Sequence, residues 1–362
     1  MKNFLDLVDR EAIEYAYLYL LGRKVESRKV VDAYLRAEMT VGTLYDIIAN
    51  SHEYKVKQSL SGANELQVYR GYKESDLEVL KSFDIKPPAQ PGFVTDFHGG
   101  RTRTSLLWDS AQHLDGTVMP LPIPGDHHAE TIEWIGVLRS VSEAKDHFTV
   151  MEVGAGLGVW LVASGIAARQ RGLSPIRLMG IEADLERFSL MHTNLHDNGF
   201  NPDEQILIQG AVGVAAGTAY WPVQEDTRND SGLRPIRENV AEDTAYYLGR
   251  QVVTRPVQVY AMDDLLAAEP WWDLVHIDIQ GGEGELCAGV INTMSKCVRR
   301  LIVATHSRVL DGVVMDTMHR AGWQLELEKP AKMIPQVDCL SLERITPLDG
   351  TQVWFNPHLV AG

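Results

Sequence analysis

From residue 148 onward, short apolar runs alternate with segments whose apolar residues recur at helical spacing. Runs of this length are typical of buried strands, and the segments between them are typical of helices. Seven strands are predicted at 148–153, 176–181, 205–209, 273–278, 297–305, 323–327 and 352–355, with a further candidate strand at 252–259. Helices are predicted at 159–169, 185–198 and 263–268. Repeated strand–helix units form a mostly parallel sheet with helices on both faces. We therefore predict a Rossmann-like, doubly wound α/β fold with a seven-stranded sheet.

The first part of the chain has helical spacing instead. Residues 1–83 predict a small all-α domain, with helices over 12–21, 30–36, a segment that begins at Thr40, and 75–83. Residues 84–128 form a second part, a Pro/Gly-rich linker followed by an irregular stretch that includes Trp108 and is too apolar for a simple tether. We expect this stretch to cover a cleft in the third part, residues 129–362, which opens with a helix at 129–144. Residues 214–250 are a polar insertion to which the pattern assigns no order.

Composition and charge narrow the range of partners. The chain has 362 residues, 45% hydrophobic and 23% charged, which is ordinary for a globular protein. Its net charge of −15 argues against binding to nucleic acid or to an anionic membrane, because phosphate contacts need clustered Lys and Arg. The three cysteines, Cys287, Cys297 and Cys339, form no Cys-x-x-Cys pair, and neither a signal peptide nor an apolar run of about 18 residues is present. These features predict a cytoplasmic protein with no membrane span.

The most informative motif is the glycine-rich turn after the first strand of the sheet. Glu152 is followed by glycines on alternate positions, Gly154, Gly156 and Gly158, and glycines at a strand-to-helix turn let the backbone approach a ligand closely. A dinucleotide fingerprint would need a glycine where Val159 stands. The acid would repel a pyrophosphate and attract a cation, so the turn favours S-adenosylmethionine over NAD, with Glu152, Gly154, Ala155, Gly156 and Gly158 as cofactor residues. The alternative is a tight turn that binds no ligand.

Other candidate site residues lie at the ends of the next strands, where ligands of such sheets bind. Glu182 ends the second strand and could accept both ribose hydroxyls, with Ala183 beside it, although a solvated acid would also fit this position. Gly210 and Ala211 end the third strand, where small residues leave room for an adenine. We therefore predict that these four residues bind the cofactor.

Asp278 ends the fourth strand and His306 follows the fifth, so both could converge on a substrate. We predict both as catalytic residues, with Asp278 also touching the cofactor. Ionising an alcohol with a histidine base would cost about 12 kcal/mol, so proton removal must accompany methyl transfer. His306 could instead be a hydrogen-bonded core histidine. A divalent metal is possible but not favoured, because two ligands lack a third, and we predict no metal residues. His127 and His128 fit the cleft and the loop surface equally well.

These motifs resemble the FkbM-type methyltransferases, a family of class I S-adenosylmethionine-dependent O-methyltransferases. The resemblance spans about residues 130–357 and rests on Glu152-Val-Gly-Ala-Gly156, Gly180-Ile-Glu-Ala-Asp184, Gly210-Ala-Val212, His276-Ile-Asp-Ile-Gln-Gly-Gly-Glu283 and Ala304-Thr-His-Ser307. Gln280 and Ala304 stand where the family has glutamates, and Gly282 where it has alanine. The resemblance implies methyl transfer to a hydroxyl, and the two missing carboxylates weaken a metal site.

The N-terminal part resembles a helical domain attached to glycosyltransferases and methyltransferases of surface polysaccharides. The matching residues are Tyr19-Leu-Leu-Gly-Arg23 and Ser51-His-Glu-Tyr54. The resemblance implies a saccharide or polyketide hydroxyl as the acceptor, a role in polysaccharide biosynthesis and a protein partner for this domain. Two alternatives remain at this point. One is an NAD-linked sugar oxidoreductase, and the other is a non-catalytic assembly module on a methyltransferase fold.

Overall fold

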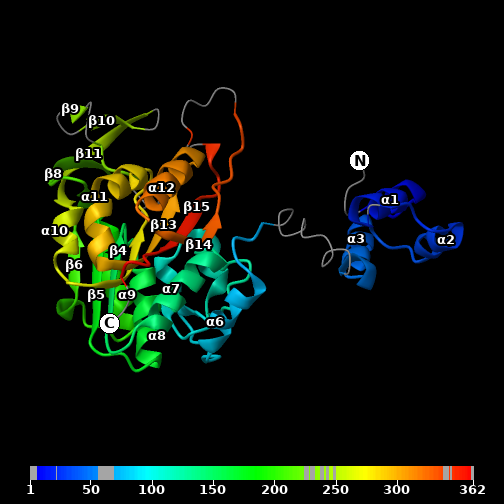
Figure 1. Cartoon of the computed structure of the whole chain (residues 1–362), viewed down its shortest axis with the longest axis horizontal. Coiled ribbons are helices and arrows are strands. Elements are labelled where there is room, and N and C mark those ends of the chain that lie inside the picture. The colour runs from blue at the N-terminus through cyan, green and yellow to red at the C-terminus, as the bar shows by residue number, and fades with distance from the viewer. Residues whose placement is uncertain are drawn as a thin grey trace. The chain divides into compact units, whose positions relative to one another are not determined.

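The chain forms two compact units in the computed structural model, residues 1–70 and residues 71–362 (Figure 1). The structure describes residues 6–21, 23–55, 69–223, 228, 233–236, 240–241, 244–247, 250–336, 342 and 345–359. Cys339 and part of the 214–250 insertion lie outside these residues. Among the described residues, no helix has the length and apolar character needed to cross a bilayer.

In its described residues the first unit contains a π-helical turn at Tyr17–Leu21 and the α-helices α1 (Arg10–Ala16), α2 (Arg28–Arg36) and α3 (Val41–Ala49). Thr40 caps α3 as predicted, because its hydroxyl accepts a hydrogen bond from the Thr43 amide at 3.3 Å. The helices enclose a small core of their own, made of Ile13, Ala16, Tyr17, Leu21, Val31, Leu44 and Ile48. Arg23 pairs with Glu53 at 2.5 Å. That ion pair joins the two motifs on which the N-terminal resemblance rests.

The second unit is built on a seven-stranded sheet, which confirms the predicted fold. Its strand order is β14 (Gln324–Lys329), β15 (Gly350–Phe355), β13 (Val298–Thr305), β12 (Trp272–Ile277), β4 (Phe148–Val153), β5 (Ile176–Glu182) and β6 (Ile206–Gln209). All neighbours are parallel except β15, which runs antiparallel to both β13 and β14. After β4 the chain forms β5 and β6, which reach one edge of the sheet, and β12 then pairs with the other side of β4. The strand order therefore switches between β4 and β12.

Helices cover both faces of this sheet (Figure 1). One face packs against α7 (Thr131–Glu143), α8 (Val159–Gln170) and α9 (Leu185–Asp197), and the other against α10 (Met262–Leu266), α11 (Glu283–Cys297) and α12 (Arg308–Arg320). Alternate residues of each strand supply the two cores: Val150 of β4 faces α7 and α8, while Met151 and Val153 face the opposite side. Both faces are buried, as the continuous apolar runs of the strands predict.

A second sheet lies beside the first. The predicted strand at 252–259 is β11 (Arg250–Ala261), which pairs with β7 (Ala211–Gly213), β8 (Gly217–Pro222) and β10 (Thr244–Tyr247), and β10 pairs with β9 (Val240–Ala241). The insertion at 214–250 is therefore partly a β-structure. The polar sequence gives these strands no clear apolar alternation, so the pattern did not reveal them.

The boundary between the two units lies after residue 70 and not after residue 83, where the sequence predicted it. Helix α6 (Leu77–Ser82) belongs to the second unit, because Leu77, Leu80 and Phe83 are buried in the same core as α7 and α8. The stretch predicted as irregular is ordered, with short 3-10 helices and the strands β1 (Phe93–Thr95), β2 (Arg101–Arg103) and β3 (Thr117–Val118). It is anchored to α9 by reciprocal hydrogen bonds between Arg101 and Asn198. Strands this short carry too few residues to show a period.

Candidate cofactor pocket and catalytic residues

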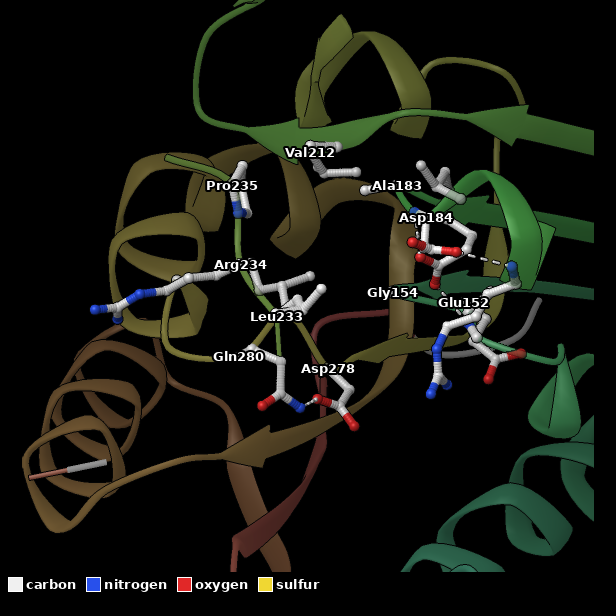
Figure 2. Close-up of a pocket in the computed structure, with 18 of the residues that line it drawn as sticks. Glu152, Gly154, Ala183, Asp184, Val212, Leu233, Arg234, Pro235, Asp278 and Gln280 are labelled. Carbon is white, nitrogen blue, oxygen red and sulfur yellow. Dashed lines mark hydrogen bonds between the residues drawn. The ribbon is translucent and has the colours of Figure 1, made fainter. Parts of the chain in front are cut away.

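A cavity of about 780 Å³ opens at the carboxyl ends of β4, β5 and β12, where the strand order switches. Ligands of doubly wound sheets bind at this position. Most predicted cofactor residues line the cavity: Glu152, Gly154, Ala155, Gly156, Glu182, Ala183, Gly210, Ala211 and Asp278. Figure 2 shows Glu152, Gly154, Ala183 and Asp278 arranged around it. The sequence thus located the pocket by the ends of its strands.

Gly158 is the exception among these residues. It does not line the cavity; it begins α8 with a left-handed backbone at φ 68°. A Cβ on Gly158 would lie 2.9 Å from Cγ of Met191. Glycine at this position therefore serves the turn and the packing of α9, which a count of spaced glycines cannot separate from ligand contact.

Two buried glutamates flank the turn. The Glu152 carboxylate accepts a hydrogen bond from the Leu161 amide at 3.0 Å, at the start of α8, and burial raises its pKa to about 8. The Glu182 carboxylate accepts from the amides of Gly156 and Asp184, both at 2.7 Å, and burial also raises its pKa. Glu182 thus joins the end of β5 to the turn after β4. The site offers carboxylate oxygens to a ligand without a lysine or arginine paired to Glu152 or Glu182 among the described residues.

The opposite wall comes from residues that the sequence did not identify. Leu233, Arg234, Pro235 and Ile236 of the insertion line the cavity, and Figure 2 shows the first three across from Glu152 and Gly154. Ile236 is tied to β8 by a pair of backbone hydrogen bonds with Tyr220. No motif marks this segment, so only the fold reveals its place.

Trp108 and His128 also line the cavity. They belong to the stretch before α7 that was expected to cover a cleft. His127 is not among the lining residues, although its ring packs against His128 with centroids 4.7 Å apart. The two neighbouring histidines therefore differ in their access to the pocket.

Asp278 and His306 meet, as their positions on β12 and after β13 predicted. Nε2 of His306 lies 3.3 Å from Oδ1 of Asp278, and its Nδ1 lies 2.9 Å from Oε1 of Glu283. The Asp278 side chain is 37% exposed and lines the cavity, whereas His306 is 6% exposed and does not. His306 therefore lies behind Asp278, away from the cavity.

The charges of this pair follow from its surroundings. Burial alone would lower the pKa of His306, but the Asp278 and Glu283 carboxylates raise it to about 11. Burial alone would raise the pKa of Asp278, but His306 brings it below its ordinary value. Near pH 7 the pair is an imidazolium and a carboxylate. In this state His306 has no lone pair with which to accept a proton, so its predicted role as base is not supported by its electrostatics.

Glu283 is a third member that the sequence analysis did not assign to the site. It is fully buried, and its carboxylate accepts hydrogen bonds from the amides of Ile279 and Gly281 at 3.0–3.1 Å. Ligand atoms of Asp278, Glu283 and His306 lie within 4.8 Å of one another. The Glu283 oxygens already accept hydrogen bonds from the loop after β12, and both ring nitrogens of His306 lie close to carboxylates. The trio therefore forms an ion-pair network within the protein.

Comparison with known proteins agrees with the motifs. The family model described as the methyltransferase FkbM domain matches residues 152–325. A relative from Jannaschia sp. (strain CCS1), named "Putative methyltransferase", is 35% identical over 243 residues, which cover 67% of this chain and 86% of the relative.

Solved structures are more distant. The ribosomal protein L11 methylase from Lactobacillus delbrueckii subsp. bulgaricus is 12% identical, with a TM-score of 0.33 and coverage of 67% of this chain and 85% of that one. The C-terminal domain of precorrin-6Y C5,15-methyltransferase from Rhodobacter capsulatus is 13% identical, with a TM-score of 0.34 and coverage of 63% and 90%. The family of this chain follows from the two sequence matches. The chain belongs to the FkbM methyltransferase family.

Proposed function

We propose that this methyltransferase moves the methyl group of S-adenosylmethionine to a hydroxyl of a saccharide or related natural product. The observation that carries the proposal is the pair of buried acids, Glu152 and Glu182, that line one cavity on either side of the glycine turn. Glu152 would face the cationic methionine end and Glu182 the ribose hydroxyls. Membership of a methyltransferase family favours this reading over hydride transfer with NAD.

The acceptor would enter beside Asp278. Trp108 and Asp349 line the same cavity, and an aromatic face with carboxylates suits a neutral sugar better than a phosphorylated one. In the reaction the S–CH₃ bond breaks as the O–CH₃ bond forms. The hydroxyl proton passes to the Asp278 carboxylate, and the products are S-adenosylhomocysteine and a methyl ether.

Calorimetric titration tests the cofactor, with S-adenosylmethionine and S-adenosylhomocysteine as probes. Both should bind the full chain with a stoichiometry of one, and NADH should not. An absence of binding by either probe, or tighter binding of NADH, would overturn the cofactor assignment. A methyl-transfer screen against glycans and nucleotide sugars tests the acceptor class. Transfer confined to acceptors without a sugar hydroxyl would overturn that part alone.

Glu182→Gln should weaken binding of S-adenosylhomocysteine by about 10- to 100-fold, because hydrogen bonds to a charged group contribute about 1.5–3 kcal/mol. Glu186→Gln is the matched control, since Glu186 is an exposed acid in the first turn of α9. It should change the dissociation constant less than about twofold. Equal effects of both variants would remove Glu182 from the ribose site.

Binding should also depend on pH through Glu152. With a pKa of about 8 the carboxyl is protonated at pH 6 in the free protein, and a cationic ligand favours its ionised form. Affinity should therefore rise about tenfold per pH unit from pH 6 towards pH 8, and binding should release a proton. Above pH 8 the ligand's own amino group loses its charge, so affinity falls again. Glu152→Gln should abolish the rise below pH 8, and a rise that survives in this variant would contradict the assignment.

A further inference from the structure

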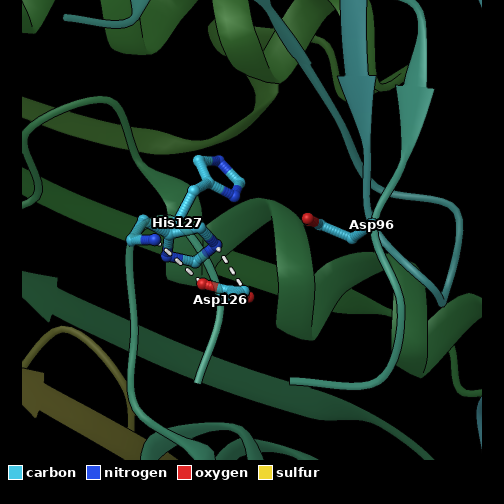
Figure 3. Close-up of side chains that lie close together, drawn as sticks. Asp96, Asp126 and His127 are labelled. Atoms are coloured by element: carbon cyan, nitrogen blue, oxygen red, sulfur yellow. Dashed lines mark hydrogen bonds and ion pairs between the residues drawn. The ribbon is translucent and has the colours of Figure 1, made fainter. Parts of the chain in front are cut away.

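A second cluster of titratable side chains lies beside the cofactor pocket. Asp96 follows β1, and Asp126, His127 and His128 precede α7. One ligand atom from each residue lies within 4.8 Å of the others. Figure 3 shows Asp96 reaching toward Asp126 and His127 from a separate segment of the chain. The fold therefore brings two histidines and two carboxylates together across 30 residues of sequence.

Asp126 is held in a fixed orientation. Its Oδ1 accepts hydrogen bonds from the amides of His128 and Ala129, both at 2.9 Å, and its Oδ2 accepts from Nε1 of Trp134 at 2.7 Å. The side chain is 3% exposed, and His128, whose Nε2 lies 3.7 Å from Oδ2 of Asp126, is 11% exposed. Oriented carboxylates with hydrogen-bonded outer partners are typical of metal ligands.

The cluster leaves polar groups unpaired. Nδ1 of His127 and Nδ1 of His128 are buried without a hydrogen-bond partner in the described part of the chain. No lysine or arginine among the described residues forms an ion pair with Asp96 or Asp126. Buried imidazole nitrogens and carboxylates without such partners are costly unless a cation or a proton compensates them. A cation bound among these four side chains would compensate both carboxylates and both imidazole nitrogens.

The donor set selects the kind of cation. Magnesium and calcium prefer oxygen ligands, whereas imidazole suits zinc and related transition metals. Four ligands placed tetrahedrally around one zinc ion at about 2.1 Å lie about 3.4 Å apart. The ligand atoms of the cluster now lie within 4.8 Å of one another, so they need to approach by at most about 1.4 Å.

We propose that Asp96, Asp126, His127 and His128 form a binding site for one divalent transition-metal ion, with Zn²⁺ the best match. Because His128 also lines the cofactor cavity, the ion would fix the stretch between β1 and α7 as one wall of the pocket. It would act by positioning this wall, and the site does not depend on which acceptor the enzyme uses.

Metal analysis of the full chain tests the site. The protein is stripped with a chelator and dialysed, then titrated with Zn²⁺. Wild type should take up one ion per chain with a dissociation constant in the micromolar range or tighter, and its melting temperature should rise. Asp96→Asn and His127→Gln should each weaken uptake at least tenfold. Uptake only at millimolar Zn²⁺ in wild type would overturn the proposal.

Two control variants locate the ion. His113→Gln changes an exposed histidine of the same stretch, which contacts the Ser110 carbonyl at 2.7 Å, and uptake should stay as in wild type. His306→Gln changes the cluster beside Asp278 and should leave uptake unchanged as well. Loss of the ion in His306→Gln, together with its retention in His127→Gln, would place the metal elsewhere and overturn the proposal.

A variant that gains a spectroscopic signal tests the same site without relying on variants that lose metal binding. Thiolate is also a zinc-site ligand, so His127→Cys should keep binding Co²⁺ and acquire a sulfur-to-cobalt charge-transfer band in the near ultraviolet. Far-ultraviolet circular dichroism of each variant serves as the check that it is folded. A folded His127→Cys protein that binds Co²⁺ without this band would show that residue 127 is not a ligand.

Discussion

Gly154→Ala is expected to lower the free energy of unfolding by about 2–5 kcal/mol and to abolish binding of S-adenosylhomocysteine. The backbone at Gly154 has φ 78°, and a Cβ built there would lie 1.8 Å from the backbone oxygen of Asp278. A left-handed backbone costs a residue other than glycine about 1–2 kcal/mol. The overlap adds about 1–3 kcal/mol as packing is forced apart. The overlap between the added Cβ and the Asp278 backbone can be relieved only if β4 and β12 move apart at the pocket.

Gly172→Ala is the matched control for this prediction. Gly172 has nearly the same φ of 74°, but nothing lies within 4 Å of its added Cβ. The free energy of unfolding of this variant should fall by only about 1–2 kcal/mol, the cost of the backbone conformation alone, and it should bind S-adenosylhomocysteine normally. Urea unfolding and calorimetry measure both effects. Equal destabilisation by the two variants would show that contact with the Asp278 backbone has no energetic role.

The position of the pocket could be predicted from the sequence through residues such as Gly154 and Asp278. Both residues end neighbouring parallel strands, and parallel strands place their carboxyl ends at one edge of the sheet. The apolar runs revealed these strands, so Glu152, Glu182 and Asp278 could be placed together without the structure. Pattern and topology were sufficient because each of these residues sits directly at a strand end.

Other parts of the site carry no such local signal. Leu233 reaches the pocket from an insertion whose polar sequence predicts no element, and it does so through the pairing of Ile236 with β8. The charge of His306 depends on Glu283, which is buried at the start of α11 and holds the loop after β12. Spacing along the chain does not report such contacts, because they depend on how three separate segments converge.

Gln280 illustrates a departure from the family pattern that the structure explains. Its backbone has φ 60°, and its Nε2 donates a hydrogen bond to Oδ1 of Asp278 at 3.2 Å (Figure 2). A glutamate at this position would present a second carboxylate to Asp278 instead of a donor. The amide therefore helps to keep the pKa of Asp278 below its ordinary value.

Asp278→Asn is expected to reduce methyl transfer about 10²- to 10⁴-fold, the usual contribution of a positioned proton acceptor. A free alkoxide is out of reach for a carboxylate, since an alcohol is about as hard to ionise as water. The oxygen becomes strongly acidic only as it gains the methyl group, and a weak base then suffices. Asp349→Asn is the control, because Asp349 also lines the pocket and lies 3.8 Å from Nε2 of His306. It should reduce turnover less than tenfold, and neither variant should change the affinity for S-adenosylhomocysteine more than tenfold.

The pH dependence of turnover decides between Asp278 and His306 as the proton acceptor. The pKa of Asp278 is lowered, so it is a carboxylate throughout the neutral range, and the pKa of His306 is raised to about 11, so it stays protonated there. With saturating cofactor and the best acceptor from the glycan screen, the turnover rate constant should show no histidine inflection between pH 6 and pH 9. The ion pair should weaken only as the pH falls through the pKa of Asp278 or rises towards 11. A rate that increases through a pKa near 6.5 and loses this increase in His306→Gln would instead make His306 the base, because only a neutral imidazole could then take the proton.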